Sequence, residues 1–307
     1  MKRVALSSVC GWILAAVVSA QDMPLSQVLI EGEDWQLMAE GYGFTDACAA
    51  DREGNLYFSD VKNGNGIFKM DLTGKVSIWR DGLPGISGLQ FGPDGKLYAC
   101  QNKQERLIRI VPGSGEVEVL AEGVRPNDLV VTALGAVYFT DTKPQEIHSV
   151  SVRGEHRVVH RGDLMRPNGI TLSPDQGTLV VSDHGAKFVW AFRIESNGDL
   201  AHGQPYMTVA TPPRTEESKG DGSTTDAYGR YYVTTDVGLQ MFDPTGRLCG
   251  VIATPAPKAV SVEFAGPGLA YLYLAADGKI FRRKTASAGV LFQEPPFLAR
   301  VYGAAAR

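Results

Sequence analysis

The sequence of 307 residues is poor in the residues and patterns that several large protein classes require. It has only 5 His and 4 Cys, scattered along the chain, and no Gly-x-Ser-x-Gly turn between a strand and a helix. These shortages argue against a Ser-His-Asp hydrolase and against a metal site built from closely spaced Cys and His. Basic residues do not cluster and the net charge is −4, so a nucleic-acid partner is not expected. Gly-rich turns such as Gly64-Asn65-Gly66 open no helix, which excludes a nucleotide-binding loop.

Long stretches with helical apolar spacing are also missing after residue 40. The chain instead holds 35 Gly and 17 Pro together with 11 Tyr and 12 Phe, a composition typical of many short strands joined by tight turns. Its hydrophobic content of 44% is enough for a full core. We therefore predict an all-β protein.

The N-terminus has the features of a secretory signal peptide. Lys2-Arg3 precedes an apolar run from Val4 to Val18, and Val18-Ser19-Ala20 provides small residues for cleavage. A membrane anchor is the weaker interpretation, because a span needs about 20 residues. We expect residues 1–20 to be removed, leaving a charge of −6 and no stable membrane association, and the protein to be periplasmic or extracellular.

Cleavage would also remove Cys10. Cys48, Cys100 and Cys249 remain, an odd number without metal-type spacing. At most one disulfide is possible, and we expect buried free thiols instead.

A unit of two strands around a Gly turn occurs six times. Aligned on the turn glycines, the second strands begin at Leu56, Leu97, Val137, Leu179, Tyr231 and Leu272, at intervals of 41, 40, 42, 52 and 41 residues. A third strand follows in each copy and a fourth in most, as in 75–79 and 116–120. Six units of four strands predict a six-bladed β-propeller with antiparallel blades, forming a single domain over residues 23–307.

Ring closure is predicted from a second similarity. The segment 35–41 resembles the fourth strand at 117–123, so we expect the N-terminal strand to complete the last blade. The segment 289–292 competes for the same place. The long interval of 52 residues contains a polar insertion at 211–220, either a solvated loop or a loop over the channel.

Each unit starts with a polar or small residue at a matched position, which we call the leader. Leaders lie eight residues before the turn glycine in most copies and nine before Gly177; they are Asp46, Ser87, Asn127, Asn168, Asp221 and, in the sixth copy, Val260 or Ser261. The first strand of a blade lines the central channel, so the leaders should form a ring at one mouth. Carboxylates and amides without His or Cys form an oxygen-only ligand set, which Ca²⁺ prefers. The alternative is that these side chains only cap strand ends.

The second strands return to the same face and end in a further set of polar residues. These are Asp60, Gln101, Asp141, Asp183 and Asp236, most of which we expect to fasten loops through backbone hydrogen bonds. His184 follows Asp183 and is the one histidine placed to carry a proton, although a surface role is the plainer interpretation.

The chain resembles the SMP-30/gluconolactonase family of six-bladed calcium propellers over nearly all of its mature length. The resemblance is carried by Phe44-Thr45-Asp46, Pro126-Asn127-Asp128-Leu129, Arg166-Pro167-Asn168-Gly169-Ile170 and Gly220-Asp221-Gly222. It implies one divalent metal, most often Ca²⁺, held by Asp46, Asn168 and Asp221, with Asn127 close to the metal or substrate. It also implies that Arg125 contacts substrate.

Two departures from the family pattern concern this metal site. Asp46 stands where the family usually has Glu in a Glu-Gly-Pro stretch, and Ala47-Cys48 follows it here. An Asp side chain is one methylene shorter than Glu, so the metal must shift or a water must bridge. In the fifth unit Gly220 and Ser223 replace the common Pro and Met.

The leading hypothesis is an exported, metal-dependent hydrolase that opens a sugar-derived lactone or a similar small ester. The cation would polarise the lactone carbonyl, and a carboxylate would accept a proton from water, with Asp221 as the first choice and Asp46 as the second. Asn127, Arg125 and His184 are the expected substrate contacts. The alternatives are a non-catalytic, calcium-stabilised propeller that binds a partner or glycan, and a related propeller that cleaves phosphoesters. The sequence does not indicate an oligomeric state.

Overall fold

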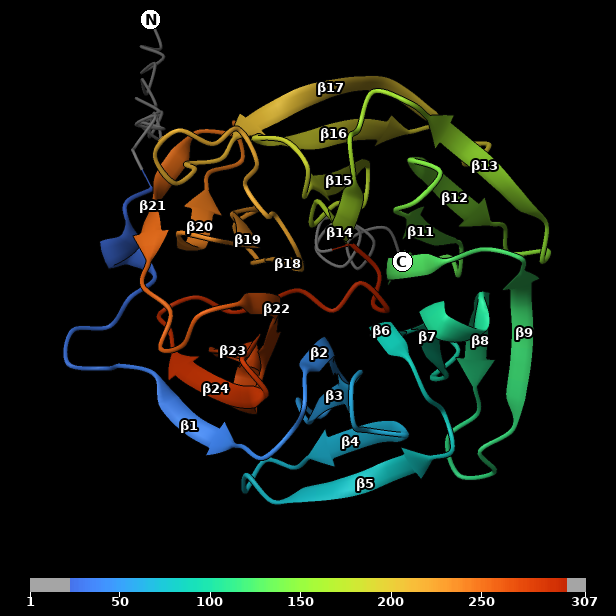
Figure 1. Ribbon diagram of the computed structural model, residues 1–307, viewed down its shortest axis with the longest axis horizontal. Helices are drawn as coiled ribbons and strands as arrows, with labels where there is room; N and C mark the ends of the chain where they lie inside the picture. Colours follow the sequence, from blue (N-terminus) through green and yellow to red (C-terminus); the bar gives the residue numbers. More distant parts are fainter. Residues whose placement is uncertain (1–22, 297–307) are drawn as a thin grey trace, which may run out of the picture.

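The protein is a six-bladed β-propeller, as predicted. A computed structural model describes residues 23–296, in which no α-helix occurs and three single-turn 3-10 helices connect strands: η1 (Leu25–Gln27), η2 (Asn102–Gln104) and η3 (Pro267–Leu269). Six four-stranded antiparallel sheets surround a central axis (Figure 1). The predicted signal peptide, residues 1–20, and the end of the predicted domain from residue 297 lie outside the described residues.

Each blade is built from consecutive strands that run from the channel outward. The first blade comprises β2 (Thr45–Ala50), β3 (Leu56–Asp60), β4 (Gly66–Met70) and β5 (Val76–Asp81). The second comprises β6 (Ile86–Phe91), β7 (Leu97–Gln101), β8 (Arg106–Ile110) and β9 (Val117–Glu122). The third comprises β10 (Pro126–Val131), β11 (Val137–Asp141), β12 (Glu146–Val150) and β13 (His156–Arg161). The fourth comprises β14 (Pro167–Leu172), β15 (Thr178–Asp183), β16 (Phe188–Ile194) and β17 (Leu200–Thr208). The fifth comprises β18 (Ser223–Thr225), β19 (Tyr231–Thr235), β20 (Gly238–Phe242) and β21 (Leu248–Ile252).

The sixth blade joins the two ends of the propeller. Its inner strands are β22 (Ala259–Ala265), β23 (Tyr271–Ala276) and β24 (Lys279–Lys284), and its outermost strand is β1 (Gln36–Ala39). β1 pairs antiparallel with β24, Leu37 opposite Phe281. The N-terminal strand therefore closes the ring as predicted, and the competing segment 289–292 forms no strand.

The hairpin turns explain the glycine period of the sequence. Gly54, Gly95, Gly135 and Gly229 all have positive φ, which glycine adopts at little cost. Gly54 is also restricted by space, since a Cβ there would lie 2.3 Å from the Gly266 carbonyl oxygen of the neighbouring blade. In the fourth blade the turn is one residue longer and Gln176 takes the positive φ instead.

The hydrophobic core consists of six clusters, one at each contact between neighbouring blades. Between the first two blades, for example, Tyr57 and Ile67 pack with Leu89 and Leu97. A comparable cluster lies between the sixth and first blades, where Phe58 meets Tyr273. Burial of this apolar surface holds each blade to both neighbours, which fixes the positions of the inner strands around the channel.

The segment after β24 crosses the face of the propeller that carries the turns between the first two strands of each blade (Figure 1). Ala227 donates its N–H to the Ala288 carbonyl, and Gln176 Nε2 donates to the Phe292 carbonyl. The Phe292 ring is buried against the third and fourth blades. The channel is thus covered at this face, and the leaders lie at the opposite end of the inner strands, which we call the mouth.

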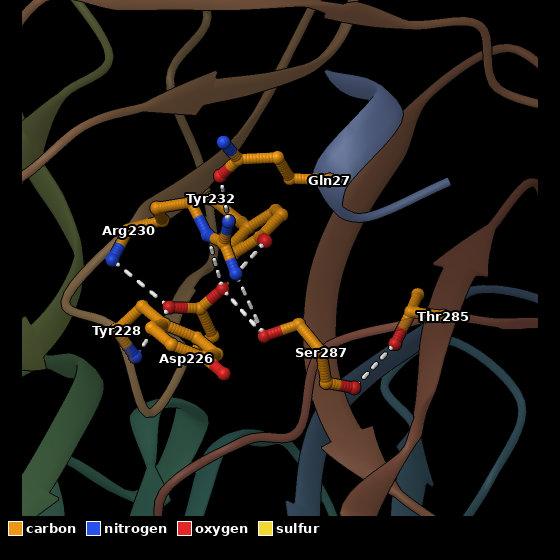
Figure 2. Close-up of polar contacts among 7 residues, drawn as sticks. All are labelled: Gln27, Asp226, Tyr228, Arg230, Tyr232, Thr285 and Ser287. Atoms are coloured by element: carbon orange, nitrogen blue, oxygen red, sulfur yellow. Dashed lines mark hydrogen bonds and ion pairs between the residues drawn. The ribbon is translucent and has the colours of Figure 1, made fainter. Parts of the chain in front are cut away.

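A buried network fastens both chain ends to the fifth blade (Figure 2). The Asp226 carboxylate accepts hydrogen bonds from Arg230 Nε at 2.6 Å, Tyr232 Oη at 2.9 Å and Ser287 Oγ at 2.8 Å. Arg230 also donates to Gln27 Oε1 and to Ser287 Oγ. Gln27, near the start of the described chain, and Ser287, near its end, therefore both bind to the Asp226–Arg230 ion pair of the fifth blade.

Two further expectations can be compared with the structure. Cys48, Cys100 and Cys249 are all free, and Cys48 and Cys100 are buried as expected, whereas Cys249 is only partly buried. Within residues 23–296 no helix is long and apolar enough to cross a bilayer.

Candidate active site

The inner strands are irregular where the leaders lie. β2, β6, β10, β14 and β22 each shift register against their partner at the start of the strand, between Asp46 and Ala49 in the first blade and between Pro126 and Leu129 in the third. Such bulges break the alternation of side chains between the two faces of a sheet and re-aim them. The leader region is therefore able to present adjacent residues to the channel.

Asp46 lies at the first of these bulges. Ala47 has a φ of 52° and donates its N–H to Asp46 Oδ1 at 2.8 Å. Burial raises the pKa of Asp46 to about 7, the Ala47 N–H opposes this, and the negative charge of Asp128 adds to it. Asp46 is therefore a buried acid at the channel mouth, and no Lys or Arg among the described residues pairs with it.

Asp221 precedes the short strand β18. Its N–H donates to the Thr234 carbonyl at 3.0 Å, and its own carbonyl accepts from Ser182 Oγ at 2.9 Å, so its backbone is fixed between the fourth and fifth blades. Burial raises its pKa well above the usual range, and the charges of Asp46 and Asp128 raise it further. The structure therefore brings Asp46 and Asp221 into one electrostatic group.

Asn168 is buried on β14 and is only partly satisfied. No described residue donates to its Oδ1, while its Nδ2 lies 3.4 Å from His184 Nδ1. A buried carbonyl oxygen without a donor is costly unless a ligand satisfies it. The orphaned Oδ1 is therefore available to accept from, or coordinate, an external ligand.

His184 is half-buried and neighbours Asn168. Burial lowers its pKa, and the nearby charges of Arg166 and Lys219 lower it further. The neutral imidazole can accept from the Asn168 amide, and this places His184 beside the candidate site rather than on a remote surface.

Asn127 and Arg125 lie at the corresponding place in the third blade. Asn127 is partly buried on β10, and no hydrogen bond from the described chain holds its side chain. Arg125 is exposed and forms an ion pair with Glu105, with 2.7 Å from Nε to Oε1. Asn127 is thus available at the mouth, whereas the charge of Arg125 is already compensated.

Asp128 is the main site residue that the leader pattern did not identify. Its two carboxylate oxygens accept from the N–H groups of Leu129 at 2.9 Å and Ile170 at 3.3 Å, the second across the gap to the fourth blade. Burial raises its pKa to about 7, and its charge in turn raises the pKa values of Asp46 and Asp221. Asp128 therefore belongs to the same acidic group.

The sequence does contain a signal for Asp128. The residue after the leader is otherwise small, being Ala47, Gly88, Gly169, Gly222 and, if Val260 is the sixth leader, Ser261. At Gly169 a Cβ would lie 2.1 Å from the Asp221 carbonyl oxygen, and at Gly88 it would lie 2.8 Å from Asp128 Cα. Inner strands approach one another closely here, so a single Asp at a position of small residues is conspicuous.

Glu263 lies deeper in the channel and was also not predicted. Its carboxylate accepts from Thr224 Oγ1 at 2.9 Å and from the Phe264 N–H at 2.7 Å, and burial raises its pKa to about 8. Glu263 and Asp128 line a cavity of about 20 Å³ that ends at Phe292, enough for about one water. This cavity is the bottom of the channel.

Most acids at the ends of the second strands fasten loops, as expected. Asp60 accepts four backbone N–H groups, including those of Gly43 and Phe44, and Asp183 accepts those of Met165, Arg166 and Gly185. These bonds tie the ends of β3 and β15 to the segments that lead into β2 and β14. They hold the leaders at the mouth without taking part in the site.

The 211–220 insertion is anchored at this same face. Ser218 is buried, its N–H donates to the Ala186 carbonyl at 3.1 Å, and its Oγ donates to the Asp183 carbonyl at 3.2 Å. Lys219 and Glu217 on this segment form an ion pair with each other and influence the pKa of His184. The insertion is therefore a rim segment beside His184, which favours the second of its two interpretations.

The sequence of this propeller matches a known family. The model described as SMP-30/Gluconolactonase/LRE-like region matches residues 44–277. The chain belongs to the SMP-30/gluconolactonase/LRE-like family. The matched range begins two residues before Asp46 and contains all of the site residues named above.

Individual members of the family are similar at modest identity. A gluconolactonase of Zymomonas mobilis is 26% identical over 231 residues, covering 67% of this chain and 65% of the relative's own length. Pentonolactonase XacC of Haloferax volcanii is 24% identical over 235 residues, covering 74% of this chain and 78% of the relative. The solved structure of regucalcin from Agrobacterium tumefaciens, a calcium-binding protein, superposes with a TM-score of 0.71 at 17% identity over 85% of this chain and 98% of that one, which supports the fold.

The family suggests a divalent metal, and the donor set can be tested for it. Among the described residues no three His, Cys, Asp or Glu side chains converge closely enough to hold a metal by themselves. The candidate set instead combines the carboxylates of Asp46 and Asp221 with the unsatisfied Oδ1 of Asn168. Two carboxylates and an amide oxygen suit a hard cation that keeps several waters, so the residues fit.

Proposed function

We propose that this protein is a metal-dependent lactonase that opens a sugar-derived lactone. The observation that carries the proposal is the group of Asp46, Asp128 and Asp221 beside the orphaned Asn168 Oδ1, at the mouth of a channel whose other end is covered. The Zymomonas relative is named a gluconolactonase and the Haloferax relative a pentonolactonase, and these names support a sugar-derived lactone as the substrate.

Asp46, Asn168 and Asp221 would hold one divalent cation, most simply Ca²⁺, with Asn127 adjacent. When bound, such a cation polarises the lactone carbonyl and stabilises the negative charge that develops on its oxygen. It would also offset the mutual repulsion of the carboxylates, which explains why they can remain charged near neutral pH.

The chain's own residues supply the proton transfers. A carboxylate takes a proton from water while the water oxygen bonds to the carbonyl carbon; the ring C–O bond then breaks, and the proton passes to the departing ring oxygen to give the hydroxy acid. Asp221 and Asp46 were the acceptors expected from sequence. Asp128 is a third candidate, and because the proposed cation does not require it, its carboxylate remains free for this step.

His184 and Asn127 would position the substrate. With Nδ1 accepting from the Asn168 amide, the neutral imidazole can donate from its Nε2–H to a sugar hydroxyl, and the free amide of Asn127 can both donate and accept. Neither residue carries a charge, which suits recognition of hydroxyl groups around the lactone ring.

Aldonolactone hydrolysis with purified protein tests the proposal. We expect ring opening with Ca²⁺, loss of activity with a chelator, and recovery when Ca²⁺ is restored. Asp128→Asn should lower kcat while cation binding persists, and Asp221→Asn should weaken cation binding itself. Glu155→Gln, an exposed acid on the opposite face, is the matched control.

Two results would contradict the proposal. A folded, Ca²⁺-stabilised protein that opens no lactone would support the alternative of a binding propeller, and activity unchanged by chelator would remove the metal from the mechanism.

We also propose that the protein is exported after cleavage behind Ala20, on the basis of the N-terminal sequence. Fractionation of expressing cells followed by N-terminal sequencing of the mature chain tests this. A cytoplasmic protein that retains Lys2 and Arg3 would contradict it.

A further inference from the structure

The tripeptide Arg-Pro-Asn occurs twice at the channel mouth, and the arginine of the second copy has no role in the function proposed above. Arg125 precedes Asn127 in the third blade, and Arg166 precedes Asn168 in the fourth. Both prolines begin an inner strand, so the two arginines occupy equivalent positions on neighbouring blades. At about 3.3 Å per residue, each Arg Cα lies about 7 Å from the Cα of its Asn, a span that a small sugar lactone can bridge.

The two arginines differ in their partners. Arg125 is paired with Glu105, whereas the Arg166 guanidinium has no carboxylate partner and no hydrogen bond among residues 23–296. The positive charge of Arg166 contributes to lowering the pKa of Glu217, but the Glu217 carboxylate already forms an ion pair with Lys219. Arg166 therefore carries an uncompensated positive charge beside the candidate site.

A second positively charged side chain, Lys143, lies near Arg166 in a groove at the channel mouth. A cavity of about 410 Å³ at the mouth is lined by Arg166, Lys143, Arg125, Gln145, Thr142 and Asn102. The Lys143 ammonium likewise has no acidic partner in the described chain. Thr142 and Gln145 fix the groove, since Thr142 Oγ1 donates to the Pro167 carbonyl at 2.9 Å and Gln145 Nε2 donates to the Met165 carbonyl at 3.0 Å.

Arg166 lines the groove and lies beside His184, which in turn contacts Asn168 of the candidate site. His184 Nδ1 lies 3.4 Å from Asn168 Nδ2. In addition the His184 N–H donates to the Arg166 carbonyl at 2.9 Å. A substrate whose carbonyl group lies near Asn168 can thus extend its far end toward Arg166 and Lys143.

We propose that the preferred substrate is an acidic sugar lactone, one that carries a carboxylate or phosphate at the end remote from the lactone carbonyl. Arg166 and Lys143 bind this anionic group, the guanidinium by a paired hydrogen bond and the ammonium as a point charge. The inference rests on the proposed lactonase function and adds the substrate class. A neutral aldonolactone would leave both charges uncompensated.

The test compares three lactones with the same metal-loaded protein: glucono-δ-lactone, a glucarolactone with a terminal carboxylate, and 6-phosphoglucono-δ-lactone. We expect kcat/KM to be higher for one of the two anionic lactones than for the neutral one, and this preference to shrink with added salt. In Arg166→Gln the ratio of anionic to neutral kcat/KM should fall about tenfold or more, because a charge-assisted hydrogen bond is lost. Lys143→Gln should lower it less, and Arg166→Lys should restore part of it.

Arg153→Gln is the matched control, because Arg153 is an exposed arginine in the turn between β12 and β13 on the opposite face. It should leave the ratio unchanged. If Arg153→Gln lowers the ratio as much as Arg166→Gln does, the preference is a general charge effect and the proposal is wrong.

A binding measurement separates this inference from the lactonase proposal. Glucarate should bind to the metal-loaded protein more tightly than gluconate by calorimetry, and Arg166→Gln should abolish the difference. Opening of glucono-δ-lactone with no anionic preference, in catalysis or binding, overturns the substrate class alone. Absence of hydrolysis of all three lactones overturns the lactonase function and, with it, this inference.

Discussion

Two acidic centres of this propeller are built in opposite ways. Asp226 is fully buried, and its carboxylate is paired with Arg230 and accepts further hydrogen bonds from Tyr232 and Ser287 (Figure 2). At the channel mouth Asp46, Asp128 and Asp221 share one region without a Lys or Arg partner among the described residues, and burial raises the pKa of all three. A paired acid stabilises a fold, whereas unpaired acids held together by the fold indicate a site for an external charge.

The comparison also has a topological basis. Asp226 lies at a turn of the covered face, where the segment after β24 and the residue Gln27 can reach it. The leaders lie at the other end of the inner strands, where the described chain adds only rim loops. Gln27 and Ser287 complete the first centre, whereas no cationic side chain of residues 23–296 completes the second.

The largest expected effect concerns the unpaired centre. Asp221→Asn should lower kcat/KM for an aldonolactone by about 10³-fold or more, because a ligand charge or a proton acceptor is lost. The stability of the metal-free protein should be equal or higher, since one repelling charge is removed. Steady-state kinetics and denaturant unfolding check both parts, and a variant that loses stability in step with activity would make Asp221 a structural residue like Asp226.

Substitution of Asp226, the acid of the paired centre, should have the reverse effect: stability should fall and activity should be retained. Asp226→Ala should lower the free energy of unfolding by about 3–5 kcal/mol, because the Arg230 guanidinium would be left buried and unpaired. Activity per folded molecule should be retained, as Asp226 lies at the covered face. Urea unfolding measures the first quantity, and an active-site titration of the folded fraction measures the second. A loss below 1 kcal/mol would show that the ion pair does not fasten the chain ends.

Much of the architecture was predictable because its signals are local. The glycine turns specify the hairpins, so second strands were placed correctly at Leu56, Leu97, Val137 and Tyr231, and one residue late at Leu179 and Leu272. Closure by the N-terminal strand followed from the similarity of 35–41 to 117–123. The segment 289–292 was harder to place, since it binds across turns of several blades and such contacts leave no periodic pattern.

The candidate site was only partly predictable, for a reason of geometry. Leaders in matched register identified Asp46, Asn168 and Asp221, which the structure brings to one mouth. Asp128 was missed because alternation along a strand would turn the residue after a leader away from the channel, and the bulge at Pro126 to Leu129 changes this. Glu263 was missed because depth in the channel depends on how six strands pack together.

The pH dependence of the metal-free protein sharpens the contrast between the two centres. Asp46 and Asp128 have pKa values raised to about 7 in the folded protein, against about 3.9 when unfolded. Between these values the folded state holds protons that the unfolded state has released, so stability should fall as pH rises from about 4 to 7 and level off above it. Thermal unfolding in chelator checks the trend, which Asp128→Asn should weaken. A stability that rises over this range would mean that the carboxylates are already compensated.

The smallest expected effect tests how much a single hydrogen-bond donor to the Asp226 carboxylate contributes to stability. Tyr232→Phe removes one hydroxyl that donates to Oδ2 but leaves Arg230, Ser287 and two backbone N–H groups in place. Because the carboxylate stays paired, the loss should be about 1 kcal/mol, the value of a single hydrogen bond, and not that of a broken ion pair. Chemical denaturation beside Asp226→Ala measures the two on one scale. A Tyr232→Phe loss that approaches that of Asp226→Ala would mean that the hydroxyl, rather than the guanidinium, holds this centre together.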